Sequence, residues 1–369
     1  MAADPERWSD LPEKLAALAA VARDRGVDTL VLRDPANLTW LLGGRVNVPQ
    51  TLDAACLDVV VDVTGDVEVA PRITIVTNAI EAPRLRDTEL AGVDATWEVV
   101  PWWEGRDPQL PRGDRVGSDR PLSGSMPAAA ELARLRRRLT TRQRRLLREV
   151  CADTAAAASA TATGLTPTTT EYEAAGLLAR ELLDREVDPI VLLVGGETRL
   201  DAHRHPLPTG ASLGGRGMLV ACGRRHGLIA SVTRIVSFTP LEPSQRDAYE
   251  RLLAVEQAFL DASQVGARLG DVVASGAAAY GANGFDPHEW RRHHQGGFSG
   301  FQPREFPASL DSDEVIPEGA VLAWNPSGAG WKVEDTALIE SGGPDPLVHD
   351  DTWPTVKVVD RLRPDVLVR

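Results

Sequence analysis

The sequence predicts two domains, a smaller α/β domain in residues 1–120 and a larger α+β domain in residues 128–369. Three observations lead to this prediction. Runs of β-branched residues dominate the first third of the chain, helical patterns are grouped between about 130 and 183, and strand-like runs then follow. Helices that are grouped, rather than alternating one by one with strands, fit an α+β arrangement better than a parallel βαβ series.

The first domain is predicted to begin with a helix and to continue with strands. Apolar residues at helical spacing in residues 15–22 predict the helix, Gly26 predicts its end, and residues 29–34 predict a strand. Further β-branched runs predict strands at 57–63, 73–78 and 96–101. Residues 105–125 are rich in Pro, Gly, Ser and charge and contain only a brief strand-like stretch, RVGSD, so a linker is expected there.

The second domain is predicted to begin with two helices separated near Thr140. A third helix is expected from Glu171, because threonines at 168–170 can cap it and Glu171 and Glu173 lie in its first turn. The remaining expected elements are strands at 187–196, 217–223 and 226–238, a long helix at 243–263, and strands around 321–325, 331–340 and 356–360.

Composition restricts the class of protein. A chain of 369 residues with 43% hydrophobic residues can bury a core, which excludes disorder as its dominant state. A net charge of -13 argues against a nucleic-acid binder. The three cysteines are too widely spaced for a disulfide framework or a zinc motif, and no apolar run is long enough for a membrane helix. We therefore expect a soluble, cytoplasmic protein with no nucleic-acid or membrane partner.

Histidines are the most informative polar residues. Five of the seven fall into two clusters, and the clusters comprise His203 with His205, and His288 with His293 and His294. Imidazole is well suited to acid/base chemistry near neutral pH. The alternative is that these histidines are simply tolerated in exposed loops. Neighbouring Gly-Gly pairs favour a ligand site, because glycine lets the backbone approach a ligand closely.

The order of short motifs resembles that of a known family. The chain carries, in this order, LVGG followed by a histidine, a strand ending in VTR, HHQGG, WNP and VED. This order resembles that of the pita-bread proteins, which include methionine aminopeptidases, prolidases, proline-specific aminopeptidases and creatinase. The first 120 residues resemble the N-terminal domain of creatinase and prolidase. The resemblance implies a pita-bread domain in 128–369 behind a smaller creatinase-like α/β domain, and a homodimer.

The resemblance also implies positions for metal ligands. Metallopeptidase members hold two divalent metals through two Asp, one His and two Glu. The matching positions in this chain are Val220, Ser231, His294 with His293 as a one-residue alternative, Asn325 and Glu334. Only two ligands remain, so we expect neither a dinuclear metal centre nor any other cofactor. A mononuclear site built from another combination of histidines stays open.

Creatinase offers a metal-free precedent, because in that enzyme a histidine transfers the proton. The family histidine maps to His203, seventeen residues before Val220, and His205 would point the same way on an extended strand. The candidate catalytic residues are His203, His205, His294 and Glu334. The candidate substrate-binding residues are Arg199, Arg204, His293, Arg304, Asn325 and Lys332. Solvated arginines, a purely structural Lys332–Glu334 ion pair and a packed Cys222 thiol are the alternatives.

The predicted function is a metal-independent, creatinase-like hydrolase or lyase that acts on a C–N bond of a small amino-acid-like substrate. One alternative is a divalent-metal-dependent Xaa-Pro aminopeptidase or dipeptidase. The other is a non-catalytic pita-bread binding protein, since one fold serves both binding and catalysis.

Overall fold

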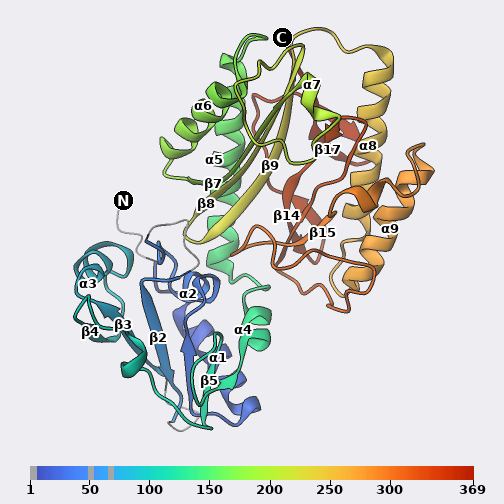
Figure 1. Cartoon of the computed structure of the whole chain (residues 1–369). Coiled ribbons are helices and arrows are strands. Elements are labelled where there is room, and N and C mark those ends of the chain that lie inside the picture. The colour runs from blue at the N-terminus through green and yellow to red at the C-terminus, as the bar shows by residue number, and fades with distance from the viewer. Residues whose placement is uncertain (1–5, 49–53, 65–69) are drawn as a thin grey trace. The chain divides into compact units, whose positions relative to one another are not determined.

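The computed structural model describes residues 6–48, 54–64 and 70–369 (Figure 1). It divides into one unit that runs to Arg136 and includes Thr140–Arg142, and a second unit of Arg137–Leu139 and Gln143–Arg369. Each unit combines helices with a sheet. The predicted mixed fold class is confirmed.

The first unit is built on a six-stranded mixed sheet. Its strand order is β4 (Thr96–Val100), β3 (Arg72–Asn78), β2 (Leu57–Asp62), β1 (Thr29–Leu32), β5 (Val116–Ser118) and β6 (Met126–Pro127). Its helices are α1 (Leu11–Arg25), α2 (Pro35–Leu42), α3 (Glu81–Arg84) with a π-helical turn Leu85–Glu89, a 3-10 turn Asp107–Gln109, and α4 (Ala129–Leu135). The α1 helix and strands β1 to β4 confirm the elements predicted for this region.

The stretch expected to be a linker contains part of this sheet. Strand β5 pairs in parallel with β1, with Gly117 opposite Leu30, and β6 extends the sheet by one more strand. A Cβ atom at position 117 would come within 2.9 Å of the Leu30 side chain, so glycine fits this place. The strand-like stretch RVGSD contains β5, whereas the two residues of β6 carry too little pattern to be recognised. The units divide at residues 136–143, later in the chain than expected.

The second unit contains an eight-stranded sheet. The strand order is β10 (Gly296–Phe298), β11 (Ala320–Trp324), β14 (Asp335–Glu340), β9 (Leu228–Ser237), β8 (Arg216–Arg225) and β7 (Asp188–Gly196), with β15 (Gly343–Pro346) beside β14 and β18 (Leu367–Val368) beside β9. Two hairpins accompany it, β12 (Ser327–Gly328) with β13 (Trp331–Lys332), and β16 (Thr355–Val358) with β17 (Arg361–Pro364).

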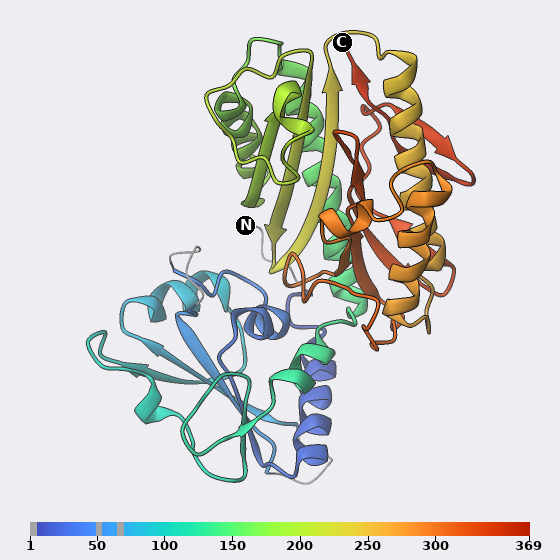
Figure 2. The ribbon, with the colours of Figure 1, turned by 45° about the vertical axis from the view of Figure 1, so that its right-hand side comes forward.

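Helices flank both ends of this sheet (Figure 2). They are α5 (Thr141–Gly164) beside β8, α6 (Glu171–Leu183) beside β7, the short α7 (Glu197–Leu200) after β7, α8 (Pro243–Ala262) beside β11, and α9 (Leu269–Ala282), which packs against α8. The α9 helix was not predicted, because its many Gly and Ala residues blur the helical pattern. They are needed for packing, since a Cβ at Gly276 would overlap the Phe259 ring.

Residues 331–340 form two strands rather than the single strand expected. β13 ends at Lys332, β14 begins at Asp335, and Glu334 lies between them. Behind this break, a buried ionic network links Asp335 to Arg234 at 2.8 Å and to Arg363 at 2.9 Å. Arg363 also pairs with Glu256 of α8 at 2.6 Å. The network joins the VTR and VED motifs and fixes the segment that carries Glu334.

Candidate functional site

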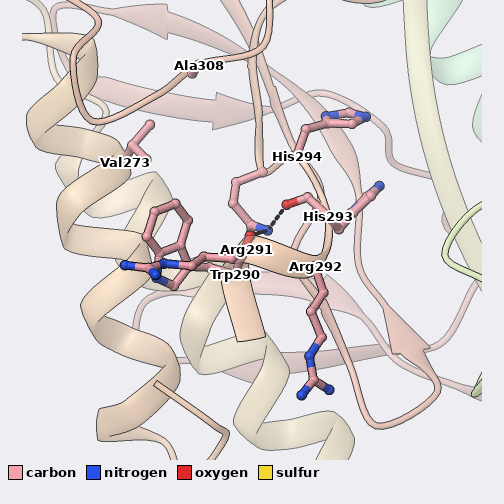
Figure 3. A pocket seen from close by; sticks show the side chains of 8 residues that line it. Val273, Trp290, Arg291, Arg292, His293, His294 and Ala308 are labelled. Carbon is pink, nitrogen blue, oxygen red and sulfur yellow. Dashed lines mark hydrogen bonds between the residues drawn. The ribbon is translucent and has the colours of Figure 1, made fainter. Parts of the chain in front are cut away.

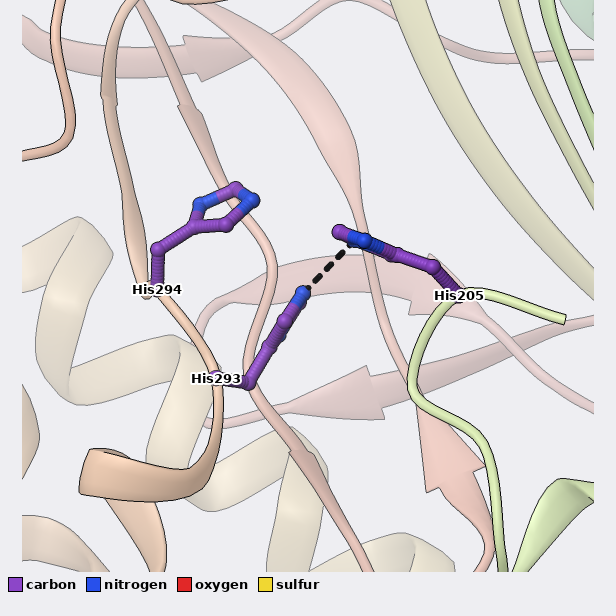
Figure 4. A group of neighbouring side chains, drawn as sticks. All are labelled: His205, His293 and His294. Carbon is purple, nitrogen blue, oxygen red and sulfur yellow. Dashed lines mark hydrogen bonds between the residues drawn. The ribbon is translucent and has the colours of Figure 1, made fainter.

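Three histidines from two distant segments meet in the second unit (Figure 4). The Nε2 atoms of His205 and His293 lie 2.9 Å apart, and the ring centres of His293 and His294 are 4.6 Å apart. One ring nitrogen from each histidine lies within 4.8 Å of the others. His205 belongs to the loop after α7, whereas the other two follow the 3-10 turn Glu289–Arg292. The two histidine clusters of the sequence thus form one group.

Polar contacts fix the two segments that carry the histidines. Arg204 forms an ion pair with the buried Glu289, which joins the His205 loop to the 3-10 turn. The Gln295 side chain donates hydrogen bonds to the carbonyl oxygens of Trp290 at 2.9 Å and His293 at 2.7 Å. Its own oxygen accepts a 2.9 Å hydrogen bond from the Tyr280 hydroxyl. These hydrogen bonds of Gln295 fix the backbone of the segment that carries His293 and His294.

The glycines of HHQGG serve the sheet rather than a ligand. Gly296 has a φ of 112°, and a Cβ there would overlap the carbonyl oxygen of Ala323 in β11. Only a residue without a side chain allows β10 to lie this close to β11. The expectation that this pair gives a ligand access to the backbone is therefore replaced by a packing role.

A cavity of about 380 Å³ adjoins the same segment and is lined by residues that include Val273, Trp290 and Ala308. Figure 3 shows the rings of His293 and His294 on the side of the chain away from Val273 and Trp290. His293 and His294 themselves belong to the lining of this cavity, together with Gln295. The cavity therefore adjoins two of the three clustered histidines.

Glu334 is the most strongly engaged carboxylate near the cluster. It is 3% exposed, and its oxygens contact the Lys332 ammonium at 2.7 Å and the Arg304 guanidinium at 2.5 Å. The Thr233 hydroxyl also donates to it at 3.4 Å. Sequence reasoning did not single out Thr233, although strand alternation places it on the same face as Ser231. The predicted Lys332–Glu334 ion pair is confirmed.

Burial and charge together set the protonation of the site. Burial alone would raise the pKa of Glu334, but Lys332 and Arg304 outweigh it and lower that pKa to about 2. Burial, aided by the Lys332 charge, lowers the pKa of His293 to about 3. Burial and the Arg304 charge lower the pKa of His294 to about 4, and burial and Lys332 also lower the pKa of His205. At neutral pH the site holds neutral imidazoles beside an ionised carboxylate.

The ungapped spacing that favoured His203 does not describe this site. β7 ends at Gly196, α7 and a turn follow, and His203 is exposed and outside the cluster. Because residues 203–205 are not an extended strand, the argument that both histidines point the same way is wrong. His205 is the one that joins His293 and His294.

Two of the candidate substrate-binding arginines have structural partners. Arg199 pairs with the fully buried Glu171 and donates to the carbonyl oxygen of Leu207 at 3.0 Å. Arg204 pairs with Glu289, as described above. Arg304 is the candidate arginine that the structure brings beside Glu334.

The remaining family positions carry no carboxylate. Cys222 lies opposite Ser231 in the β8–β9 pair, and Val220 lies opposite Thr233. All four residues are buried. The Cys222 sulfur is 3.5 Å from the Ser231 hydroxyl, and burial raises the pKa of this thiol. This agrees with the predicted packed thiol.

The residues at the family's metal positions do not fit a dinuclear centre. Val220 has no donor atom, Ser231 and Asn325 are neutral, and the one carboxylate, Glu334, already binds two cationic side chains. The pairing of Trp324 with Asp335 places Asn325 next to Glu334 at the end of β11. Within the described ranges, the buried Oδ1 atom of Asn325 accepts no hydrogen bond. It remains available to a ligand.

Comparison with known proteins establishes the family. Residues 145–341 match metallopeptidase family M24, which covers more than half of the chain. The protein belongs to this family, and the predicted pita-bread relationship is confirmed. A curated Bacillus subtilis (strain 168) protein, YkvY, whose name carries a provisional dipeptidase assignment, is 26% identical over 123 residues. That match spans 32% of this chain and 33% of YkvY, about a third of the relative's length.

Solved structures share the fold over nearly the whole chain. An Xaa-Pro dipeptidase from Bacillus anthracis has a TM-score of 0.74 at 13% identity, and the match covers 97% of this chain and 100% of that structure. Dipeptidase PepE from Mycobacterium ulcerans has a TM-score of 0.73 at 18% identity, with 98% of each chain covered. At these identities the likeness establishes the fold. Among the described residues, no helix is long and apolar enough to cross a membrane.

Proposed function

We propose that the protein hydrolyses the C–N bond of a small dipeptide or amide that carries a free carboxylate. The observation that supports this most directly is the cluster of His205, His293 and His294 beside Glu334 and its two cations. The family is a metallopeptidase family, and this cluster combines proton-accepting groups with groups that bind an anion.

The buried polar atoms without a hydrogen-bond partner, within the parts of the chain that the structure describes, include one at Glu334's partner arginine and one at its neighbouring asparagine. They are the Nε–H donor of Arg304 and the Oδ1 acceptor of Asn325. A dipeptide offers a carboxylate for the first and an N–H group for the second. Unpaired buried polar groups are costly, so a substrate that satisfies both would be favoured.

Within this proposal, His205 accepts the proton of the attacking water. Its side chain is exposed, and both cationic neighbours of Glu334 contribute to keeping it neutral. The water oxygen adds to the carbonyl carbon, the C–N bond breaks, and the departing nitrogen takes up the proton. Glu334 acts as a positioning residue, because it holds Lys332 and Arg304 in place.

A dipeptide is preferred over a creatine-like substrate. The similar proteins carry dipeptidase and prolidase names, which favours the alternative of an Xaa-Pro dipeptidase over the creatinase-like reaction expected first. No observation favours elimination over hydrolysis. Independence from the family's dinuclear centre stays part of the proposal, because the ligand positions do not fit it. A homodimer and a cytoplasmic location stay predictions.

Release of amine from a panel of Xaa-Pro dipeptides, other dipeptides, N-acyl amino acids and creatine tests the proposal. On the best substrate, His205→Ala should lower kcat by about 10² to 10⁴, the usual contribution of an acid/base group. His203→Ala is the matched control and should leave kcat unchanged. Arg304→Lys should mainly raise KM. If no panel member is cleaved while small carboxylates still bind, the non-catalytic alternative replaces this proposal.

A further inference from the structure

We propose that His205, His293 and His294 form a mononuclear site for a divalent transition-metal ion of the Zn²⁺ or Co²⁺ class. The site differs from the family's ligand set, since it uses three imidazoles and no carboxylate. It also departs from the sequence-based expectation of no cofactor. The inference deepens the proposed function, on which its catalytic relevance rests. With the ion bound, the lone pair of His205 would no longer be free to accept a proton, and the ion would supply the activation of water that His205 supplies in the ion-free site. The test measures the ion itself.

The geometry suits one small ion. Three imidazole nitrogens with an open fourth position form a known tetrahedral arrangement, in which bonds of about 2.0–2.1 Å place the nitrogens about 3.3 Å apart. In this structure one nitrogen from each ring lies within 4.8 Å of the others, from two segments that the Arg204–Glu289 ion pair holds together. Closing the site requires movement of side chains and little movement of the backbone.

The contact between His205 and His293 brings together two nitrogen atoms that could bind the same ion. Their Nε2 atoms are 2.9 Å apart, and such a contact requires a proton on one nitrogen and a lone pair on the other. An ion would replace this shared proton and bind both lone pairs. On the far side of the ring, the Ser327 hydroxyl lies 3.4 Å from His293 Nδ1. A partner at the second nitrogen is the usual way in which a ligating histidine is oriented.

The donor set selects the kind of ion. Imidazole binds Zn²⁺, Co²⁺, Ni²⁺ and Cu²⁺ well, whereas Mg²⁺ and Ca²⁺ prefer carboxylate and carbonyl oxygen. Glu334 is the carboxylate beside the cluster, and Lys332 and Arg304 already occupy it. We therefore expect the site not to bind Mg²⁺ or Ca²⁺.

Neighbouring charges determine the fourth ligand. The charged groups that face the cluster are Lys332, Arg304 and Glu334, which together carry one net positive charge. A dication adds to this positive charge, so an anion in the fourth position is favoured. A carboxylate held by Arg304 meets this need. Binding of the ion and binding of a carboxylate ligand should therefore strengthen each other.

Equilibrium dialysis of the chelator-treated full chain against Zn²⁺ or Co²⁺ tests the inference, with elemental analysis and the visible Co²⁺ spectrum as readouts. We expect one equivalent per chain and a spectrum typical of tetrahedral nitrogen coordination. His205→Ala, His293→Ala and His294→Ala should each weaken binding by about 100-fold or more, and Ser327→Ala by about tenfold, the range of outer-shell losses. Added L-proline, as a carboxylate probe, should tighten ion binding.

His203→Ala provides the matched control, because it lies two residues from His205 and outside the cluster. It should bind the ion as the unmodified chain does. Thermal unfolding of each ion-free variant separates loss of ligand from loss of fold, and the corresponding Gln variants replace any Ala variant that fails to fold. Zero or two equivalents, or one equivalent that survives all three ligand substitutions, would overturn the inference. An ion that binds without any peptide cleavage leaves this site standing and removes the proposed function.

Discussion

The Lys332 ammonium and the Glu334 carboxylate meet at 2.7 Å, and each side chain is only 4% exposed. Glu334 lies in the short connection between β13 and β14, two residues after Lys332, which ends β13. Arg304 contacts the other carboxylate oxygen at 2.5 Å. The protein thus places two cations at the carboxylate that corresponds to a family metal ligand, an arrangement that does not suit a dinuclear metal centre.

This pair should behave as a buried ion pair whose partners depend on each other. Glu334→Gln leaves Lys332 and Arg304 without their counter-charge, and we expect the free energy of unfolding to fall by about 3 kcal/mol or more. The double variant Lys332→Met with Glu334→Gln removes one buried cation and should lose less than the sum of the two single variants. Urea unfolding of the four proteins measures the coupling. Strict additivity would show that the contact contributes nothing.

Stability should depend on pH in two overlapping windows. The pKa values of His293 and His294 are lowered to about 3 and 4, so their unfolded forms bind protons more readily. Their contribution is present above the unfolded pKa of about 6.5 and is lost as the pH falls from there toward about 4 for His294 and about 3 for His293. The pKa of Glu334 is lowered to about 2, so its contribution is present above about 4.5 and is lost as the pH falls toward 2.

Urea unfolding of the ion-free protein between about pH 7 and pH 4.5 isolates the histidine window. The free energy of unfolding should decrease across this range, and His293→Gln should flatten the decrease. His349→Gln is the control, because that histidine is exposed and remote in sequence from the cluster. An unchanged slope in His293→Gln would show that this imidazole is not held neutral by the fold.

Local signals in the sequence were sufficient for most elements. The helix predicted from Glu171 begins there, and Thr170 and Glu173 form the reciprocal capping hydrogen bonds at 3.2 and 2.8 Å. Such contacts join residues three apart, so the sequence displays them directly. The β-branched runs that form β2 and β3 are also visible directly in the sequence, because consecutive side chains of a strand alternate between its two faces.

The site was less predictable because its contacts join residues far apart in the chain. His205 and His293 are 88 residues apart, and nothing in either segment indicates that they meet. The family spacing pointed to His203, since it assumed a strand where the chain forms α7 and a turn. Whether an arginine binds a substrate or a buried carboxylate depends on partners such as Glu171 and Glu289, which only the fold reveals.

Gly296 should be intolerant of a side chain. Its φ of 112° is unfavourable for other residues, and a Cβ would overlap the carbonyl oxygen of Ala323. We expect Gly296→Ala to lower the free energy of unfolding by more than about 1 kcal/mol and to weaken the histidine site two residues away. Gly342→Ala is the control, because a Cβ there meets nothing within 4 Å. Equal stability of the two variants, measured by urea unfolding, would contradict the packing role.

Arg199 and Arg204 look alike in the sequence but should differ sharply on substitution. Arg199→Ala leaves the fully buried Glu171 without its cation, although three hydrogen bonds from Gly196 and Thr209 remain. We expect a loss of about 1–3 kcal/mol in the free energy of unfolding. Arg204→Ala should cost less than about 1 kcal/mol, because Glu289 keeps Arg292 at 3.1 Å.

For metal binding, unlike stability, Arg204→Ala should have the larger effect of the two substitutions. Arg204 joins the His205 loop to the turn that precedes His293, so Arg204→Ala should weaken the cluster even though the fold survives. We expect its affinity for Co²⁺ to fall about tenfold, as for loss of an outer-shell contact, while Arg199→Ala keeps its affinity in the folded fraction. Urea unfolding and Co²⁺ titration of the same two samples provide both readouts. If Arg204→Ala loses stability but keeps its affinity, the ion pair supports the fold and does not position His205.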